Sequence, residues 1–317
     1  MWLDLTIILI SFLIMTWSSD LFVDGAIAIA DHLKMPKVII GTVLVGFTTA
    51  VPELLVSFDA AINGSSGIAI GNALGSYIIN IALVLGITAL IIPIKISKSI
   101  LKREVPVMAF SLFIALALMS DGYFGFNDGV ILLLMLLITI IAFTVIILKS
   151  NSNKINVNVT IKYSYMASWL YLVIGLMLLI VSARMLTSSA VSLAQYFGVS
   201  DLIIGLTIVA IGTSLPELAA SVAGVKKGED DIAIGNVIGS NILGMFAVLA
   251  MPAIFSPGSV PKIMIYRDFA FMGLTTITFW IACYCFDGDK LVINRVEGLC
   301  GIFIFFIYIA LLYFYPA

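Results

Sequence analysis

The chain has 317 residues, of which 62% are hydrophobic and only 11% are charged, and its formal net charge is −2. About 25% of the residues of a soluble domain are charged, so this chain has too few to cover a soluble fold of its size. It has no basic stripe for a nucleic-acid partner, too few cysteines (three) for a disulfide scaffold, and a single histidine, which argues against a histidine-ligated metal enzyme. The composition therefore predicts a polytopic membrane protein.

Ten apolar runs of membrane-spanning length follow one another along the chain. A helix needs about 20 apolar residues to cross the hydrocarbon core of a bilayer. The runs are unbroken and do not alternate with a period of two, which favours helices over the strands of a membrane barrel. The start of the chain lacks the positive charge of a signal peptide, so the first run is expected to be retained. The predicted spans are residues 5–30, 37–62, 68–93, 104–120, 128–149, 164–196, 201–225, 232–255, 264–286 and 296–315.

The one clearly polar connection divides these runs into two groups of five. We therefore predict an all-α integral membrane protein of ten transmembrane helices, with a first five-helix repeat at residues 1–149 and a second at 164–317. Residues 150–163 form the predicted linker between them.

The positive charges of the connections predict the orientation. With the N-terminus outside, the cytoplasmic connections hold 13 of the 16 Lys and Arg residues, whereas the outer connections hold only Lys262 and Arg267. The remaining one, Arg184, falls inside a predicted span. We expect a multi-pass protein of the cell membrane with both termini extracellular and the central loop cytoplasmic.

An internal repeat relates the two halves. Residues 41–86 match residues 205–250 at a constant offset of 164 positions without a gap, and 18 of the 46 positions are identical. Because each half has an odd number of spans, the second copy enters the membrane with the opposite polarity. Such inverted-topology repeats are typical of secondary transporters, which bind ions near the bilayer midplane at helices broken by Gly or Pro.

A Pro-Glu pair lies in the middle of each matched span. Proline clashes with the carbonyl four residues back, so we expect each helix to kink or unwind before Pro52 and Pro216. A glutamate at that depth is costly, which makes Glu53 and Glu217 candidates for a functional site, although each could simply be protonated or bonded to a neighbouring helix. Freed carbonyls need partners in hydrocarbon, and a cation is one. The carbonyls concerned are those near Gly46, Thr49, Ala210 and Thr213.

A Gly-Asn-x-x-Gly-Ser motif follows each Pro-Glu pair, at residues 71–76 and 235–240. Glycines four apart let helices approach closely, so helix packing alone is one explanation of the motif. The other is ion binding, because Asn and Ser offer uncharged oxygen ligands of the kind that hard cations such as Ca²⁺ and Na⁺ prefer. The lack of Cys and His at these positions disfavours zinc or copper.

Together, the duplicated Thr-Ser-Leu-Pro-Glu-like and Gly-Asn-x-x-Gly-Ser segments resemble the repeats of the cation/calcium antiporter superfamily, specifically those of the prokaryotic sodium/calcium exchangers. The resemblance covers essentially the whole chain and implies exchange of Ca²⁺ for Na⁺ by alternating access. By position, Glu53 and Glu217 are implied as the central Ca²⁺ ligands, with the carbonyls of Thr49 and Thr213. Asn80 is implied to lie beside both glutamates.

The resemblance also implies two flanking Na⁺ sites. One is formed by Ser76, Thr49, Glu53 and the carbonyl of Gly46. The other is formed by Ser240, Thr213, Glu217 and the carbonyl of Ala210.

Three positions depart from the pattern of that family. Many such exchangers have an aspartate one turn after the second Gly-Ser, where this chain has Gly244. Ala50 stands where the second copy has Ser214, and Tyr77 stands where the second copy has Asn241. The stoichiometry and the coupling ion are therefore left open. A proton/calcium antiporter is the alternative, but that branch has a glutamate within its Gly-Asn segment, which neither copy has here, so we favour sodium.

Other functional classes fit less well. The two acids do not resemble a protease pair, and no His-Glu-x-x-His motif occurs. Channels usually build their filters from identical subunits, which paired broken helices do not suggest. No phosphate-binding Gly-rich loop occurs, so ion gradients are expected to drive transport. We expect no enzyme activity, no cofactor and no obligate protein partner beyond the lipid bilayer.

The first and sixth predicted spans are long and carry small residues, which makes them candidates to slide across the rest of the protein. Asp20 and Arg184 lie in these spans, also 164 positions apart. We expect these two residues to pair near the two-fold axis, because pairing lowers the cost of a charge in lipid.

Overall fold

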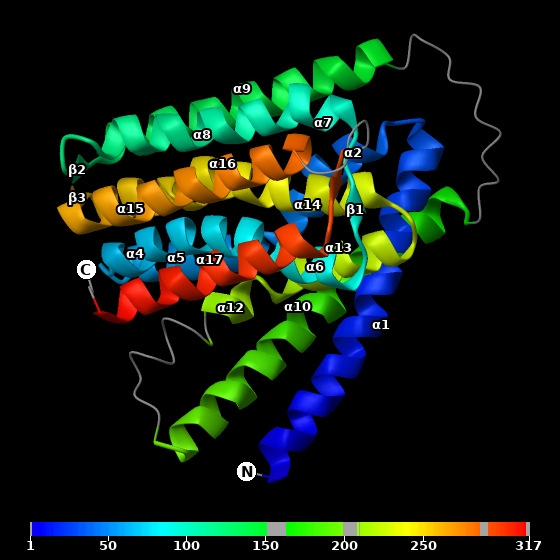
Figure 1. The fold of residues 1–317 in the computed structure, drawn as a ribbon, viewed down its shortest axis with the longest axis horizontal. Coiled ribbons are helices and arrows are strands. Elements are labelled where there is room, and N and C mark those ends of the chain that lie inside the picture. The colour runs from blue at the N-terminus through cyan, green and yellow to red at the C-terminus, as the bar shows by residue number, and fades with distance from the viewer. Residues whose placement is uncertain (1, 151–162, 199–207, 209, 286–290, 315–317) are drawn as a thin grey trace.

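The structure is a computed structural model that describes residues 2–150, 163–198, 208, 210–285 and 291–314. The described chain is almost entirely helical (Figure 1). Its first half consists of α1 Trp2–Leu33, α2 Lys37–Ile39, the π-helix η1 Ile40–Val45, α3 Gly46–Thr49, α4 Val51–Ile62, α5 Ser66–Ile79, the π-helix η2 Asn80–Val84, α6 Leu85–Ile91, β1 Ile94–Lys95, α7 Lys98–Lys102, α8 Glu104–Met119, β2 Tyr123–Phe124 and α9 Phe126–Ser150.

The second half follows the same order. It consists of α10 Tyr165–Tyr196, α12 Ala210–Thr213, α13 Leu215–Lys226, α14 Asp230–Leu243, the π-helix η4 Gly244–Val248, α15 Ala250–Phe255, β3 Gly258–Ser259, the π-helix η5 Met264–Asp268, α16 Phe269–Cys285, β4 Val292–Ile293 and α17 Arg295–Phe314.

Several of these helices are long and apolar enough to cross a membrane. Within the described residues there are six by length and composition, or seven if the bent pair of residues 37–49 and 51–62 counts as one span. The fold is therefore helical and of membrane-protein type, and the full set of ten spans stays a prediction. Residues 151–162 of the predicted linker lie outside the described residues.

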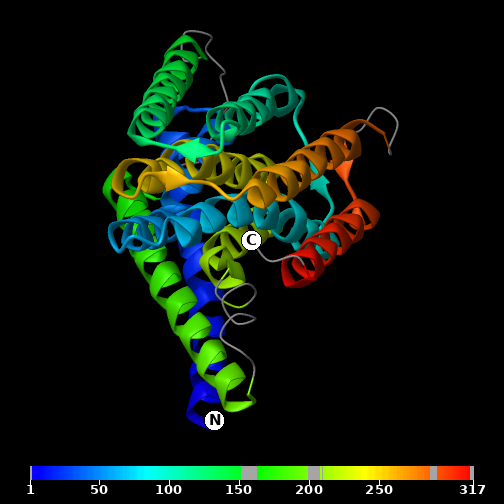
Figure 2. The ribbon, with the colours of Figure 1, turned by 90° about the vertical axis from the view of Figure 1, so that its left-hand side faces the viewer.

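The helices α1 and α10 pack side by side, and Figures 1 and 2 show the N-terminal part of α1 and the C-terminal part of α10 projecting beyond the other helices. They run antiparallel, with Gly25 against Leu172 and Gly175 against Phe22. Small residues recur every seven positions along the contact and let the backbones approach closely. The residues in this stripe are Ser11, Ser18 and Gly25 in α1, and Ser168, Gly175, Ser182 and Ser189 in α10.

This crossing makes the expected pairing of Asp20 with Arg184 wrong. Because Phe22 packs on Gly175 in an antiparallel pair, Asp20 lies opposite the residues near 177, which are about 10 Å along the helix from Arg184. The Arg184 side chain is exposed. Asp20 instead lies 3.6 Å from Lys227 Nζ, at the end of α13.

The expected breaks before the two prolines are confirmed. In the first copy α3 ends at Thr49 and α4 begins at Val51, with a bend of 40° between the two halves. In the second copy α12 ends at Thr213 and α13 begins at Leu215. Each proline stands in the first turn of the following helix, where it needs no backbone N–H partner. The helix breaks thus place the following glutamates at new helix N-termini.

Two short strand pairs tie loops from the two halves together. β1 pairs with β4, and β2 pairs with β3, both antiparallel. β1 and β3 are 164 positions apart in the chain, yet Figure 1 shows them at opposite ends of the horizontally drawn helices. Equivalent segments thus lie on opposite faces of the protein.

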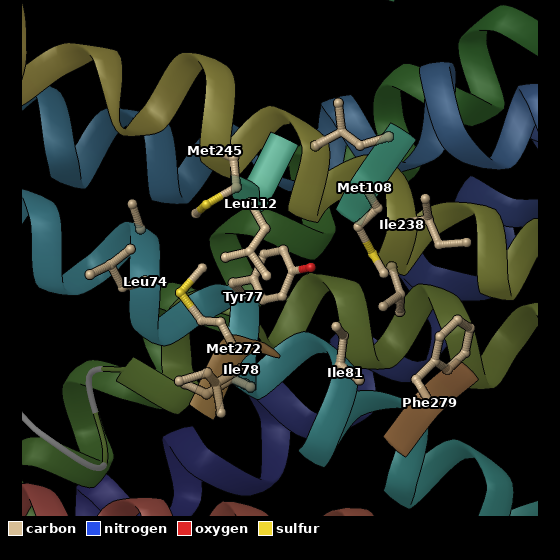
Figure 3. Packing of buried hydrophobic residues seen from close by; sticks show 14 of the residues in the cluster. Leu74, Tyr77, Ile78, Ile81, Met108, Leu112, Ile238, Met245, Met272 and Phe279 are labelled. Carbon is tan, nitrogen blue, oxygen red and sulfur yellow. The ribbon is translucent and has the colours of Figure 1, made fainter. Parts of the chain in front are cut away.

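An apolar core surrounds the middle of α5 (Figure 3). Tyr77 is fully buried among Met108, Met245 and Met272. Its hydroxyl lies 2.8 Å from the hydroxyl of Thr276 on α16, so its polar end is satisfied.

Candidate cation-binding site

Glu53 lies in the first turn of α4, and its side chain is only 3% exposed. Its backbone carbonyl accepts a 3.0 Å hydrogen bond from Asn72 Nδ2, which also donates to Ser57 Oγ. One carboxylate oxygen, Oε1, lies 3.4 Å from the Ser214 hydroxyl, which donates to it from the second copy. Hydrogen bonds from the first copy thus hold the backbone at Glu53, while the Glu53 carboxylate contacts the second copy.

Glu217 occupies the equivalent place in α13 and is fully buried. Asn236 Nδ2 donates to the Glu217 carbonyl over 3.0 Å and to Ser221 Oγ over 2.9 Å, which repeats the first copy bond for bond. The Ser240 hydroxyl lies within hydrogen-bonding distance of Glu217 Oε1, at 3.4 Å. The asparagine of each Gly-Asn motif therefore has a structural role, since its amide nitrogen fixes the turn that carries the glutamate.

Hydrogen bonds also connect the two copies directly. Thr49 Oγ1 donates to Asn236 Oδ1 over 2.9 Å, and Ser240 Oγ donates to the Gly46 carbonyl over 3.0 Å. The Thr49 and Ser240 hydroxyls are 3.3 Å apart. Ser240, which the resemblance groups with Thr213 and Ala210, thus contacts the first copy as well.

The glycines explain how the copies come so close. A Cβ on Gly46 would lie 2.6 Å from the Asn236 carbonyl oxygen, and one on Gly235 would lie 2.7 Å from the Val38 carbonyl oxygen. On Gly239 it would overlap the backbone of Thr42. Helix packing therefore accounts for the glycines of the second motif.

Three oxygens at the centre have no hydrogen-bond partner, among the residues that the structure describes. They are Oε2 of Glu53, Oε2 of Glu217 and Oδ1 of Asn80, and all three are buried. The amide nitrogen of Asn80 is engaged, since it donates to Asn241 Oδ1 over 3.1 Å. Buried acceptors without partners are costly, and the two carboxylates also repel one another. A hard cation bound by oxygen ligands would relieve both costs.

A small cavity opens beside Glu53 at this point. The space available to the centre of a water molecule is about 10 Å³, which is about enough for one water or one ion of similar size. Its walls are Ala50, Glu53, Ala73, Ser76, Tyr77, Asn80, Ser240, Asn241, Gly244 and Val248. The site therefore has both the ligand chemistry and the space for a small cation.

The residues predicted from the sequence mostly come together here. Those that line the cavity or bond across the two copies are Glu53, Thr49, Ser76, Ser240, Asn80 and the carbonyl of Gly46. Glu217 is connected to this group through its hydrogen bond with Ser240, which lines the cavity. Ala210 and Thr213 begin and end α12, directly before the second break. One contributor missed at the sequence level is Ser214, the partner of Glu53. The equivalent residue in the first copy is Ala50, and this difference between the two copies was the one feature of the sequence that pointed to Ser214.

The family model described as "Sodium/calcium exchanger protein" matches residues 3–148 and 167–314. The chain belongs to the sodium/calcium exchanger family. This confirms the resemblance drawn from the repeated motifs. Members of the family are membrane antiporters, so the chain is a multi-pass membrane antiporter for cations and not an enzyme.

Relatives in this family are similar over most of their length. Inner membrane protein YrbG of Escherichia coli is 35% identical over 291 residues, which cover 90% of each chain. Sodium/calcium exchanger MaX1 of Methanosarcina acetivorans is 32% identical over 298 residues, which cover 82% of this chain and 85% of that one.

The fold is also similar to a solved exchanger of the same family. The sodium-calcium exchanger NCX_Mj, from crystals soaked with Na⁺ and Sr²⁺, superposes with a TM-score of 0.81 and 32% sequence identity. The match covers 97% of this chain and 98% of NCX_Mj. Similarity over the whole length means that both halves of the exchanger fold are present here.

Proposed function

We propose that this protein exchanges Ca²⁺ for Na⁺ across the cell membrane by alternating access. Glu53 and Glu217 hold either one Ca²⁺ or sodium ions, so the two kinds of ion compete for one site. The backbone carbonyls of Thr49 and Thr213 and the side chain of Asn80 complete the central site. Two Na⁺ sites flank the central site. Ser76 and the carbonyl of Gly46 contribute to one of them, and Ser240 and the carbonyl of Ala210 contribute to the other.

One observation carries the proposal more than any other. Three buried oxygens without a hydrogen-bond partner among the described residues belong to the central glutamates and Asn80, beside a cavity for one small ion. A purely structural site would satisfy these oxygens with donors from the protein. A site that binds and releases cations has to leave them available.

The proposed architecture is a ten-helix inverted repeat, with five spans in residues 1–149 and five in residues 164–317. Support comes from the constant offset between the copies, from the matching breaks, and from β1 and β3 at opposite ends. The excess of positive charge in alternate connections supports extracellular termini and a cytoplasmic central loop.

The pair formed by α1 and α10 supports a sliding step. These helices pack on one another along their stripe of small residues, and one end of the pair projects beyond the other helices. A pair of helices joined in this way moves as one body. Its displacement along the broken helices would open the central site to one side of the membrane and then to the other.

Sodium coupling is favoured over proton coupling. Neither Gly-Asn motif contains a glutamate that could carry a proton, and one relative, MaX1, is named a sodium/calcium exchanger. Oxygen ligands such as hydroxyls and carbonyls suit Na⁺ as well as Ca²⁺.

Uptake of radioactive calcium into proteoliposomes tests the proposal. The vesicles are loaded with sodium and diluted into sodium-free buffer at matched pH, and a proton gradient without sodium serves as the control. We expect uptake only when internal sodium is present. Uptake driven by the proton gradient alone would assign the protein to proton/calcium exchange instead.

A further inference from the structure

The side-chain amide of Asn80 has two chemically opposite ends of nearly the same shape. Its oxygen, Oδ1, accepts hydrogen bonds and coordinates cations, whereas its nitrogen, Nδ2, carries two donors. Among the described residues Oδ1 is the end without a partner, and Asn80 lines the same cavity as Glu53. The opposite orientation would let Nδ2 donate to a carboxylate, which is a strong hydrogen bond. Another group therefore has to hold the oxygen in this place.

Asn241 holds the Asn80 amide in this orientation. Asn80 Nδ2 donates to Asn241 Oδ1 over 3.1 Å, and both side chains are buried. The other end of the Asn241 amide is also engaged, because its Nδ2 donates to the backbone carbonyl of Tyr77 over 3.4 Å and lies 3.8 Å from the sulfur of Met108. A carbonyl oxygen only accepts, so turning the Asn241 amide over would place two oxygens against one another. The chain of hydrogen bonds from Tyr77 through Asn241 to Asn80 therefore has one favourable direction.

The equivalent pair of positions in the repeat differs at both residues. Tyr77 is equivalent to Asn241, and Gly244 is equivalent to Asn80, each at the offset of 164. Gly244 has no side chain to orient, and the Tyr77 hydroxyl lies 2.8 Å from the hydroxyl of Thr276. Both residues nevertheless line the cavity. An asparagine thus stands at this position in the copy that faces a side chain to be oriented, and a different residue stands there in the copy that does not.

We infer that Asn241 is a positioning residue of the proposed cation site, which holds the Asn80 amide so that its oxygen faces the transported ion. Asn241 acts through Asn80, because its own oxygen is occupied by Asn80 Nδ2 and its nitrogen can only donate. Side chains that orient the ligands of a bound ion in this way typically contribute about 10- to 100-fold in affinity. This inference rests on the proposed exchange of Ca²⁺ for Na⁺ at this site.

Loss of Asn241 has a specific consequence for the site. Asn80 Nδ2 would lose its buried acceptor, and the amide would turn over to donate to Glu53 instead. The nitrogen would then stand where a cation ligand is needed, and the carboxylate would be satisfied without an ion. We therefore expect weaker binding of both Ca²⁺ and Na⁺ by a protein that is still folded.

Calcium titration of the purified protein and sodium-driven calcium uptake measure this effect. Asn241→Leu removes the acceptor at similar volume, and we expect its calcium affinity to fall about 10- to 100-fold. Ser111→Ala is the matched control, because Ser111 is also buried and its hydroxyl donates to the carbonyl of Met108 in its own helix. We expect the calcium affinity of this control to stay unchanged. Unchanged affinity of Asn241→Leu would overturn the inference.

A second background separates orientation of the ligand from support of the fold. In Asn80→Asp both ends of the side chain are oxygens, so no partner is needed to choose between them. At alkaline pH, where the added carboxyl is ionised, adding Asn241→Leu to Asn80→Asp should change the calcium affinity by no more than about twofold. Asn80→Ala, which has no amide to orient, gives the same comparison without an added charge. An equally large loss in the wild-type and altered backgrounds would show that Asn241 does not act through Asn80, and would overturn the inference.

The remaining outcomes are also decisive. If Asn241→Leu does not fold, the smaller Asn241→Ala removes the same acceptor and takes its place in each background. Failure of both substitutions to fold would assign Asn241 to the fold and overturn the inference. Absence of calcium binding by the wild-type protein, or uptake that does not need sodium, would overturn the proposed exchange itself, and both are measured on the unaltered protein.

Discussion

Thr49 and Asn236, 187 residues apart in the chain, are joined by a 2.9 Å hydrogen bond between the Thr49 hydroxyl and the Asn236 side-chain oxygen. The amide nitrogen of Asn236 meanwhile holds the Glu217 carbonyl. One asparagine therefore connects the break in the first copy to the glutamate of the second. A displacement of either broken helix would therefore shift both the first break and Glu217. This coupling suits a site whose two halves must change their exposure together.

The first prediction concerns this bond. Thr49→Val keeps the shape of the side chain but removes the donor, so Asn236 Oδ1 is left buried without its partner. We expect a loss of about 1–3 kcal/mol in the free energy of unfolding and weaker calcium binding. Thermal unfolding in detergent and calcium titration measure the two effects. Thr48→Val is the control, because the Thr48 hydroxyl bonds only to carbonyls of its own helix and should cost less.

The second prediction concerns the carboxylates. Glu53→Gln and Glu217→Gln each remove one of the two charges that balance Ca²⁺, so we expect sodium-driven calcium uptake to fall about 100-fold or more. The amide is close in size to the carboxylate, so the protein should remain folded and monodisperse. Asp59→Asn is the matched control on the same helix, since Asp59 is exposed and its carboxylate accepts a hydrogen bond from Asn63. Full activity of both glutamine variants would disprove the assignment.

The third prediction separates packing from ligand binding in the second motif. The Cβ of Gly239→Ala would overlap the Thr42 backbone, which cannot move without shifting the first copy. We expect a loss of about 1–3 kcal/mol or more in stability, seen as a lower melting temperature in detergent. Gly273→Ala is the control, because no described atom lies within 4 Å of its added Cβ. Equal melting temperatures for the two variants would contradict the close approach of the helices.

The sequence predicted the local features that depend on residue type and spacing. Pro52 and Pro216 break their helices where expected, because proline cannot continue the ladder of backbone hydrogen bonds in any context. The repeated Pro-Glu pairs singled out Glu53 and Glu217, and the structure buries both in the first turn after their helix breaks. Composition alone was enough to predict a membrane protein.

Features that depend on how helices pack could not be predicted. Asp20 and Arg184 matched by offset, but the crossing of α1 and α10 separates them and brings Asp20 to Lys227 instead. The bond from Ser240 to the Gly46 carbonyl likewise depends on the distance between helices, and no sequence spacing fixes that distance. The sequence spacing likewise gave no sign of the π-helices that begin at Asn80 and Gly244.

The last prediction concerns the contact between α1 and the end of α13. Lys227 Nζ lies 3.0 Å from Asp24 and 3.6 Å from Asp20, one turn away on α1, so a slide of α1 by one turn would exchange one partner for the other. Because the pair is partly exposed, Lys227→Gln should destabilise this position of α1 by only about 0.2–1 kcal/mol. We expect an approximately two- to five-fold change in the apparent calcium affinity from one side of the membrane. Lys226→Gln is the control, since Lys226 is exposed. Identical affinities for the two variants, together with unchanged hydrogen exchange in the second half of α1, would show that Lys227 does not hold this helix.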